Sequence, residues 1–589
     1  MRRIVEKSML GKAWVALNDS ITDTDDDLIN NILKSRGIVE KEDIEKFLNP
    51  SWKPCMPDPF VLQDMEKAIK IIADSVCNHE KIAIYGDYDV DGITSTAVFV
   101  KYLREAGVDV CWHLPTREGE GYGLNIDAID ELAQSGVDLL ISVDCGISGI
   151  QEVKHAKELG LKVVITDHHS PDNVLPEADA VVNPKRQDDT SGLTYLAGVG
   201  VAFMTLVALN RELRTRKFFE KDLRYYLDLV ALGTICDTMP LIGSNRLLVK
   251  KGLEVMACSD ANLGLRTLMK KAGAKLSKYR EKDGNEKETA TVYIAGFVLG
   301  PRLNAAGRLD SAEPALKLLL TDKIAEAEML AQQLDAQNTQ RIEKQAEVMR
   351  DATDLAELCC KNGKCSIFVC GKNWPGGVMG IVAGRLKDKY NKPICVATEV
   401  DGVINGSGRS VSNIDLGKII HEALALGILT EGGGHAAAAG FTLNAYKEKE
   451  FCEFLERSVK EQLSNSKPEE VVFVDIERDA SGANKELVKR LSVLEPFGQG
   501  NPEPTIVLNG ATLKYIRYKG SGNTISGRVR TANNTELSFV AFNAIGTAIG
   551  DFLQDEENTN TPIKMLGKLK ENEYNGGKQV QFILEDIAL

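Results

Sequence analysis

Three aspartates stand at alternate positions directly after a short apolar run at residues 82–85. They are Asp87, Asp89 and Asp91, within the string GDYDVDG. Alternate side chains of an extended backbone share one face, so these carboxylates are expected to converge. Their mutual repulsion favours a bound divalent cation. An exposed acidic turn is the simpler alternative, and a calcium loop is disfavoured because no Glu stands at its twelfth position.

Further carboxylates and imidazoles end other apolar segments. Asp144 ends DLLISVD, while His168 and His169 follow Asp167 at the end of KVVITD. Asp237 follows the apolar segment ALGTIC. Each residue alone is more typical of a helix cap or a turn. Asp144, His168 and His169 together lie where parallel sheets bind ligands, and mixed oxygen and nitrogen donors suit manganese, iron, zinc or magnesium better than calcium.

The elements that must position these residues follow from periodicity. Between 81 and 165 short β-branched runs alternate with helical patterns, including a helix at about 94–106, which predicts a parallel sheet in an α/β domain. The stretch 196–273 is mostly helical, and 281–290 is expected to be a loop. Strong helix formers over 312–358 predict a long helix joining two lobes. A coiled-coil dimerisation helix is disfavoured because residues 337–341 break the apolar heptads.

Two more regions follow the long helix. A glycine-rich α/β pattern begins near residue 365, and past Pro468 strand patterns separated by Gly and Asn turns predict a small β-barrel. A length of 589 residues requires several domains. The 12 cysteines form no CxxC pair, so reduced thiols are expected in place of disulfides or a zinc ribbon.

Composition narrows the class of protein. No apolar stretch is long enough to span a bilayer, and the N-terminus lacks a signal-peptide pattern, so a soluble cytoplasmic protein is expected. The formal net charge of -14 argues against a general nucleic-acid coat protein. It does not exclude a local basic groove.

The motifs, taken in order, resemble those of the DHH phosphoesterase superfamily. The resemblance rests on GDYDVDG, VDCG, DHH and GTICD. Four further strings, GPRLNAAGR, GSGRS, GGGHAAAAG and LEPFGQGNPEP, resemble those of its bacterial single-strand-specific exonucleases. The resemblance runs from about residue 60 to the C-terminus.

The resemblance implies two manganese or magnesium ions at the strand ends. Asp144 is the implied bridge between the ions. Many members carry a histidine where this chain has Tyr85. Asp87 or water is therefore expected to complete the coordination of the first ion. His169 would touch the scissile phosphate, and Asp144 and His168 would also serve catalysis. The implied metal residues are Asp87, Asp89, Asp91, Asp144, His168 and Asp237.

Phosphate-binding residues are implied as well. Arg117 matches the position that holds the DNA 5′ phosphate. The other implied substrate residues are Arg302, Asn304, Arg308, Ser407, Arg409, Ser410 and His435. The terminal barrel resembles an OB-fold, and its basic residues with interleaved Tyr515 and Tyr518 would bind single strands. Those basic residues are Lys514, Arg517, Lys519, Arg528 and Arg530.

The resulting hypothesis is a metal-dependent 5′-to-3′ exonuclease that hydrolyses single-stranded DNA to 5′-mononucleotides in DNA repair and recombination. It is expected to be a monomer that works with a helicase and a single-strand-binding protein. Two alternatives stay open: a phosphatase for short oligonucleotides or cyclic dinucleotides, and an inactive replication factor. The expected domains are an N-terminal helical segment at 1–60, a DHH catalytic domain at 61–310, a connecting helix at 311–362, a DHHA1 domain at 363–465 and the OB-fold-like domain at 466–589.

Overall fold

The computed structural model describes residues 2–17, 27–116, 119–280, 286–309, 311–464, 470–518, 523–574 and 577–589. Arg117 and Lys519 therefore lie outside the described residues. The chain forms two compact units, of which the smaller comprises Met1–Met56, Pro240–Leu247 and Pro468–Leu589. The larger comprises Pro57–Met239 and Leu248–Lys467. Among the described residues, no helix has both the length and the apolar character needed to cross a bilayer.

The first sheet of the larger unit is fully parallel, which confirms the expected α/β fold. Its strand order is β4-β3-β5-β6-β7. Every residue of β3 and β5 is buried, as continuous apolar runs predict for strands covered on both faces. The strands are β3 (Ile82–Tyr85), β4 (Val110–His113), β5 (Leu139–Val143), β6 (Lys162–Thr166) and β7 (Ala180–Val182).

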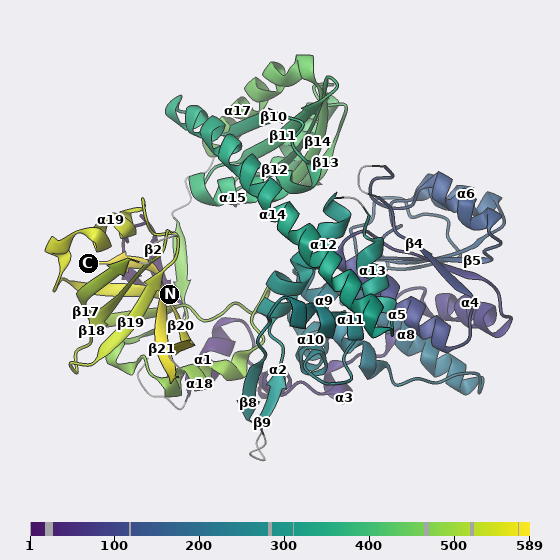
Figure 1. Cartoon of the computed structure of the whole chain (residues 1–589), viewed down its shortest axis with the longest axis horizontal. Helices are drawn as coiled ribbons and strands as arrows, with labels where there is room; N and C mark the ends of the chain where they lie inside the picture. The colour runs from purple at the N-terminus through teal and green to yellow at the C-terminus, as the bar shows by residue number, and fades with distance from the viewer. Residues whose placement is uncertain are drawn as a thin grey trace. The chain divides into compact units, whose positions relative to one another are not determined.

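Helices cover both faces of this sheet (Figure 1). On one face, α6 (Ile126–Gln134) and α7 (Ile150–Glu158) pack against alternate strand residues such as Ala83 and Leu140. The other face contacts α5 (Val90–Glu105) and α8 (Gly198–Thr215). Helix α5 begins four residues before the predicted start, because the Asp89 carboxylate caps it by accepting from the backbone N–H groups of Asp91 and Gly92.

The predicted helical region is present, with two differences from expectation. The single helix expected over 312–358 is divided into α13 (Glu313–Leu320) and α14 (Ile324–Lys361). Thr321 adopts an extended backbone there, and its hydroxyl donates to Glu326 and accepts from the N–H of Lys323. The expected loop at 281–290 includes β9 (Glu286–Thr289), which pairs with β8 (Ser277–Arg280).

The remaining elements of this region surround the first lobe. They are α4 (Met65–Cys77), α9 (Leu227–Cys236), α10 (Gly243–Met256), α11 (Leu263–Lys271), the π-helix η4 (Ile294–Leu299) and α12 (Gly300–Leu309). Helix α14 packs against α11 and α12, and farther along it contacts β10 and α15 of the second lobe. Figure 1 shows α14 extending from the first lobe to the second.

The second lobe is a mixed sheet with order β10-β11-β12-β14-β13. Only β10 and β11 run parallel, and the other neighbours are antiparallel. Apolar clusters form on both sides of the sheet. The strands are β10 (Ile367–Lys372), β11 (Ile394–Val400), β12 (Val403–Arg409), β13 (Glu431–His435) and β14 (Ala438–Asn444), and the helices are α15 (Gly376–Tyr390), α16 (Leu416–Ala425) and α17 (Glu448–Ser464).

The smaller unit contains the predicted terminal barrel. Pairing of its first long strand, β17, with β20 closes the sheet, and β16 (Ile476–Asp479) adds parallel to β17. The barrel strands are β17 (Ile506–Tyr518), β18 (Ile525–Arg530), β19 (Glu536–Ala541), β20 (Pro562–Tyr574) and β21 (Gly577–Ala588).

The N-terminal segment is not wholly helical, contrary to the expectation for residues 1–60. Strands β1 (Arg2–Val5) and β2 (Ala13–Ala16) pair with each other, and β2 pairs in parallel with β15 (Val471–Val474). The buried Trp14 indole donates to Asp586 over 3.1 Å. Helices α1 (Leu28–Ser35), α2 (Lys41–Leu48) and α3 (Trp52–Cys55) follow. This segment therefore belongs with the barrel, not with the catalytic sheet.

Candidate metal centre

The predicted metal residues meet at the carboxyl ends of the parallel strands. Asp87 follows β3, Asp144 follows β5 and His168 follows β6 by two residues. Asp237 is the C-terminal cap of α9, while Asp89 and Asp91 lie at the start of α5. Three overlapping groups have ligand atoms within 4.8 Å of one another: Asp87, Asp89 and Asp144; Asp91, His168 and Asp237; and Asp144, His168 and His169.

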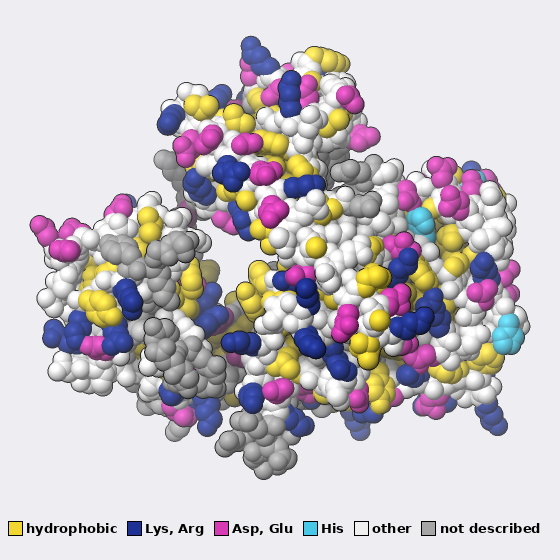
Figure 2. All heavy atoms as spheres, viewed as in Figure 1, with side chains coloured by type: hydrophobic (Ala, Val, Ile, Leu, Met, Phe, Trp, Pro, Cys, Tyr) yellow, Lys and Arg dark blue, Asp and Glu magenta, His cyan; other side chains and the backbone are white. Residues whose placement is uncertain are grey.

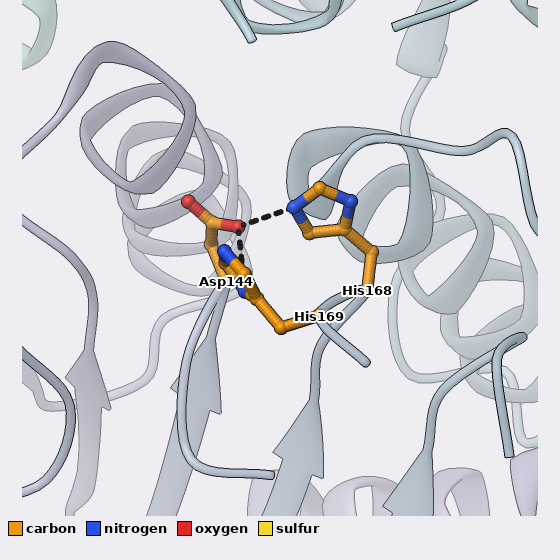
Figure 3. Close-up of side chains that lie close together, drawn as sticks. All are labelled: Asp144, His168 and His169. Atoms are coloured by element: carbon orange, nitrogen blue, oxygen red, sulfur yellow. Dashed lines mark ion pairs between the residues drawn. The ribbon is translucent and has the colours of Figure 1, made fainter. Parts of the chain in front are cut away.

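His168 presents a lone pair to the carboxylates. Its Nδ1 lies 3.1 Å from the carbonyl oxygen of Leu196, which can only accept, so Nδ1 carries the proton. The unprotonated Nε2 then lies 3.2 Å from Asp144 Oδ1 and 3.5 Å from Asp237 Oδ2. Figure 3 shows this imidazole directed at the Asp144 carboxylate, with His169 beside it. Two facing electron-pair donors at this distance repel each other unless a proton or a metal cation lies close to both.

Burial shifts the pKa values of these groups toward their uncharged forms. Burial and then the charge of Asp91 raise the pKa of Asp144, and burial and then Asp237 raise that of Asp91. Burial also raises the pKa of Asp237 to about 7 and lowers that of His168 to about 3. Among the described side chains, Asp144 Oδ1 and His168 Nε2 are buried atoms without a hydrogen-bond partner. These residues therefore fit a divalent metal ion, which would favour the ionised carboxylates and the neutral imidazole.

Asp91 is oriented by the start of α8. Its Oδ2 accepts from the N–H of Gly198 over 2.7 Å, and its Oδ1 accepts from the N–H of Val199 over 2.9 Å. Helix N-termini favour anions because their N–H groups are free and the helix dipole is positive there. The backbone of α8 therefore fixes this carboxylate while leaving further lone pairs for an ion.

Asp167 differs from the buried metal residues because its carboxylate accepts several hydrogen bonds. Its carboxylate accepts from the N–H groups of Ile147, His168 and His169 over 2.7–3.0 Å. Its Oδ1 also lies 2.8 Å from His169 Nδ1. Burial opposes ionisation, yet these bonds lower the pKa of Asp167. Asp167 thus orients the DHH loop and is not grouped with the metal residues.

His169 stands at the rim of the group. Burial disfavours its charged form, but the hydrogen bond to Asp167 and the nearby carboxylates raise its pKa to about 9. Its Nδ1 also lies 2.9 Å from the hydroxyl oxygen of Tyr122. Tyr122 did not emerge from the sequence as a site residue, although it lies in the same glycine-rich segment as Arg117.

Two glycines at the centre were also missed. A Cβ on Gly198 would lie 2.3 Å from Asp144 Oδ1, and one on Gly233 would lie 2.9 Å from Asp91 Oδ1. At contacts this short, a side chain in place of either glycine would force a neighbouring atom to move. The only sequence signal is a glycine inside an otherwise helical apolar run, which does not reveal the neighbour it touches.

The Tyr85 ring belongs to an apolar cluster. It is fully buried in this cluster beneath α6 and α7, 4.8 Å from the His113 ring between centroids. Asp87 instead lies among the metal residues.

The predicted substrate residues have varied surroundings. Arg409, on β12, donates to Ser407 Oγ over 3.2 Å, and Gly380 of α15 packs against its guanidinium. Arg308 donates to the carbonyl of Gly377 at the start of α15 over 2.7 Å. Asn304 is half-buried on α12, and His435 is exposed at the end of β13.

Two of these residues have structural partners. Arg302 pairs with Asp335 over 2.9 Å and donates to the carbonyl of Val298, which joins α12 to α14. Ser410 is buried, and its hydroxyl donates to the carbonyl of Ile414. These contacts orient the two side chains that sequence reasoning assigned to phosphate.

Helix α12 contacts the first lobe through two glycines and the second lobe through Arg308. A Cβ on Gly300 would lie 2.6 Å from Cys236 Sγ, next to Asp237, and one on Gly307 would lie 2.9 Å from the carbonyl of Tyr88. The GPRLNAAGR motif therefore packs against the segments that precede Asp237 and Asp89. Through Arg308 it also packs against α15.

The basic barrel surface is partly neutralised. Lys514 and Arg528 both pair with Glu536. Arg517 and Arg530 are exposed, and Tyr515 is 47% exposed beside them. The side chain of Tyr518 is outside the described residues.

Three family models match the chain. Residues 81–234 match the DHH family N-terminal domain, residues 362–461 the DHHA1 domain and residues 474–586 the RecJ OB domain. A relative from Escherichia coli K12, the single-stranded-DNA-specific exonuclease RecJ, is 33% identical, and the alignment covers 95% of each chain.

Solved structures are similar in fold. RecJ of Thermus thermophilus in complex with Mn²⁺ is 29% identical with a TM-score of 0.77, covering 95% of this chain and 76% of that one. The complex of the same organism's RecJ with Mg²⁺ gives 27% identity and a TM-score of 0.69, with 95% and 74% covered.

Proposed function

Because this chain belongs to the RecJ family of single-stranded-DNA-specific exonucleases, we propose that it hydrolyses single-stranded DNA in a metal-dependent reaction during DNA repair and recombination. We further propose that it acts from the 5′ end and releases 5′-mononucleotides. The observation that carries this function is the buried pair of electron donors, Asp144 Oδ1 and His168 Nε2, 3.2 Å apart.

We propose that two divalent ions, manganese or magnesium, occupy the centre. Asp87 and Asp89 would hold one ion, and Asp91, His168 and Asp237 would hold the other, with Asp144 between them. This division follows two of the groups of ligand atoms. When bound, such ions polarise the phosphate, lower the pKa of water and stabilise the leaving oxygen.

His169 acts on the substrate in this proposal. Asp167 holds its ring through Nδ1, so Nε2 is directed away from that bond and toward incoming phosphate. Although burial opposes it, the hydrogen bond from His169 Nδ1 to Asp167 raises the pKa of His169 and so favours the protonated imidazole, which would stabilise the charge that develops on the phosphate. The Tyr122 hydroxyl lies beside the same Nδ1 and helps to fix the ring.

The remaining regions are proposed to guide the strand. Residues 61–310 carry out hydrolysis and 311–362 connect them to the 363–465 lobe, where Ser407 and Arg409 hold phosphate together with Arg308. Asn304 and His435 contribute polar groups. Arg117 binds the 5′ phosphate. The 466–589 region, with exposed Arg517 and Arg530, binds the strand before it reaches the centre.

We also propose that the protein acts in the cytoplasm as a monomer. A helicase and a single-strand-binding protein would supply and protect its substrate, since duplex DNA offers no free strand.

The test is a label-release assay. Purified protein with Mn²⁺ is given single-stranded DNA labelled at either end, with duplex DNA as the substrate control and Asp144→Ala as the variant control. Prompt release of the 5′ label as a mononucleotide, lost in the variant, is expected. Activity confined to dinucleotides or cyclic dinucleotides would instead support the phosphatase alternative, and an absence of hydrolysis would support the inactive factor.

A further inference from the structure

Two exposed aromatic rings stack on each other at the edge of the catalytic lobe. Tyr293 is 66% exposed and Phe297 is 70% exposed. Their ring centroids lie 5.6 Å apart with planes inclined by 16°. Tyr293 immediately precedes the π-helix η4 and Phe297 lies within it, so both occupy one side of the same turn. Exposed apolar patches and short π-helices both recur at binding sites.

The π-helix is fixed to the end of the helix that bears Asp237. The thiol of Cys236 donates to the carbonyl of Ala295 over 3.6 Å. A Cβ on Gly296 would lie 3.3 Å from Cγ2 of Ile235, so the backbone of η4 at Gly296 lies close to that side chain. Since Ile235 and Cys236 immediately precede Asp237, the aromatic pair is carried by an element that contacts the end of the helix that Asp237 caps.

Positive charge lies on a neighbouring helix. Helix α11 packs against η4 and ends in Lys270 and Lys271, with Lys275 four residues farther on. All three lysines are exposed, and none is ion-paired with a described carboxylate. Figure 2 shows Lys and Arg side chains interspersed with hydrophobic ones over α10 and α11. Flat aromatic faces on one element, together with unpaired cations on a helix packed against that element, suit a ligand with both bases and phosphates.

We propose that Tyr293 and Phe297 form a stacking platform for bases of single-stranded DNA, with the α11 lysines facing its phosphates. This inference rests on the proposed function and adds a substrate subsite next to the metal centre. Aromatic rings stack on every base, so the platform would retain the strand without selecting its sequence. The lysines would make that retention sensitive to salt.

The test removes single bases from the DNA and aromatic rings from the protein, and it asks whether the two losses depend on each other. In the non-cleaving Asp144→Asn background, fluorescence anisotropy measures the affinity for single-stranded DNAs that each lack one base. The Tyr293→Leu, Phe297→Leu double substitution keeps apolar bulk but removes both rings, whereas Tyr293→Phe keeps them. Tyr446→Leu is the matched control, because Tyr446 is 80% exposed on the second lobe.

We expect the double substitution to weaken binding of the intact strand by about tenfold or more. Removal of one particular base from the DNA should weaken binding to the Asp144→Asn protein by a similar factor. The same removal should not lower the affinity of the double variant any further. Tyr293→Phe and Tyr446→Leu should bind as their parent does. An intact dependence on that base in the double variant would overturn the platform.

Cleavage distinguishes this inference from the function on which it rests. The double substitution is also made with Asp144 intact, and release of the 5′ label is measured with Mn²⁺. Persistent hydrolysis with unchanged DNA affinity would refute the platform alone. A change in self-association without a change in DNA affinity would assign the rings to a contact between chains and would also refute it.

Discussion

Two buried carboxylates in the larger unit differ in their hydrogen-bond donors and in the direction of their pKa shifts. Glu456, on α17, accepts from the N–H groups of Cys365 and Ser366 and from the Ser366 hydroxyl over 2.7–3.1 Å. These bonds lower its pKa to about 2 although burial opposes ionisation. Asp144, at the end of β5, has no donor for Oδ1, and burial and its acidic neighbours raise its pKa.

The difference shows that the supply of donors, and not burial, separates a structural carboxylate from a ligand. Asp167 makes the same point inside the catalytic loop, because its four hydrogen bonds keep its pKa low beside Asp144. A fold that satisfies Glu456 and Asp167 but leaves Asp144 unsatisfied has a cation site at Asp144. The predictions below challenge this contrast.

Asp144→Asn should have the largest effect. Loss of the carboxylate removes a ligand shared by the proposed ions, so kcat for single-stranded DNA should fall by about 10³-fold or more. Without metal, the variant should unfold at a higher temperature than the natural chain, because one buried anion is gone. Thermal unfolding with and without Mn²⁺ checks this, and undiminished stabilisation by Mn²⁺ would contradict the assignment.

Gly198→Ala should perturb the same carboxylate without changing its charge. The added methyl would lie 2.3 Å from Asp144 Oδ1 and would displace it. Misplacement of a catalytic group by about 1 Å can cost about 10²-fold in rate, and we expect a loss of that size. Gly384→Ala is the control, because nothing lies within 4 Å of its Cβ. Equal activities of the two variants would argue against close packing at Asp144.

Glu456→Gln should reduce stability and leave chemistry intact. We expect a loss of about 2 kcal/mol in the free energy of unfolding near neutral pH, since charge-assisted hydrogen bonds become neutral. The folded pKa of about 2 lies below the ordinary value of 4.5. The stabilisation is therefore complete above the ordinary value and disappears as pH falls toward 2.

Denaturant titrations of both proteins between neutral pH and pH 2 measure this difference. It should shrink with acidification, while kcat at neutral pH stays unchanged. A difference that grows as pH falls would reverse the assigned role of Glu456.

Glu536→Gln should have the smallest effect. This exposed carboxylate pairs with Lys514 and Arg528 on the barrel, so its removal frees two cations. We expect affinity for single-stranded DNA to rise about two- to threefold at low salt and the gain to fade at high salt. Anisotropy titrations over a salt series measure it, and an unchanged affinity would place the strand elsewhere.

Sequence patterns predicted the parallel sheet and the convergence of its strand-end residues because both depend on local signals. The apolar runs that end in Asp144 and Asp167 define strands, and parallel pairing then brings their ends to one edge. The prediction of a terminal barrel succeeded for the same reason. Asp237 has no strand of its own, and only the family resemblance placed it in the site.

Other features depend on contacts between distant residues. Long side chains such as Arg302 and Lys514 can reach many partners. Local sequence patterns therefore do not predict that they pair with Asp335 and Glu536. The four residues of β2 are too few to show a period, so the N-terminal sheet was missed. Gly198 is required by Asp144, a carboxylate far earlier in the chain, which no local signal reveals.

The pairing of β2 with β15 constrains how the protein is made. Residues 13–16 lie beside residues 471–474, so the ribosome must translate the chain past residue 474 before this small sheet can form. The catalytic sheet, complete by residue 182, can fold much earlier. Domains generally fold in order of synthesis. A newborn chain would therefore complete the strands that carry most of its metal residues well before its barrel unit.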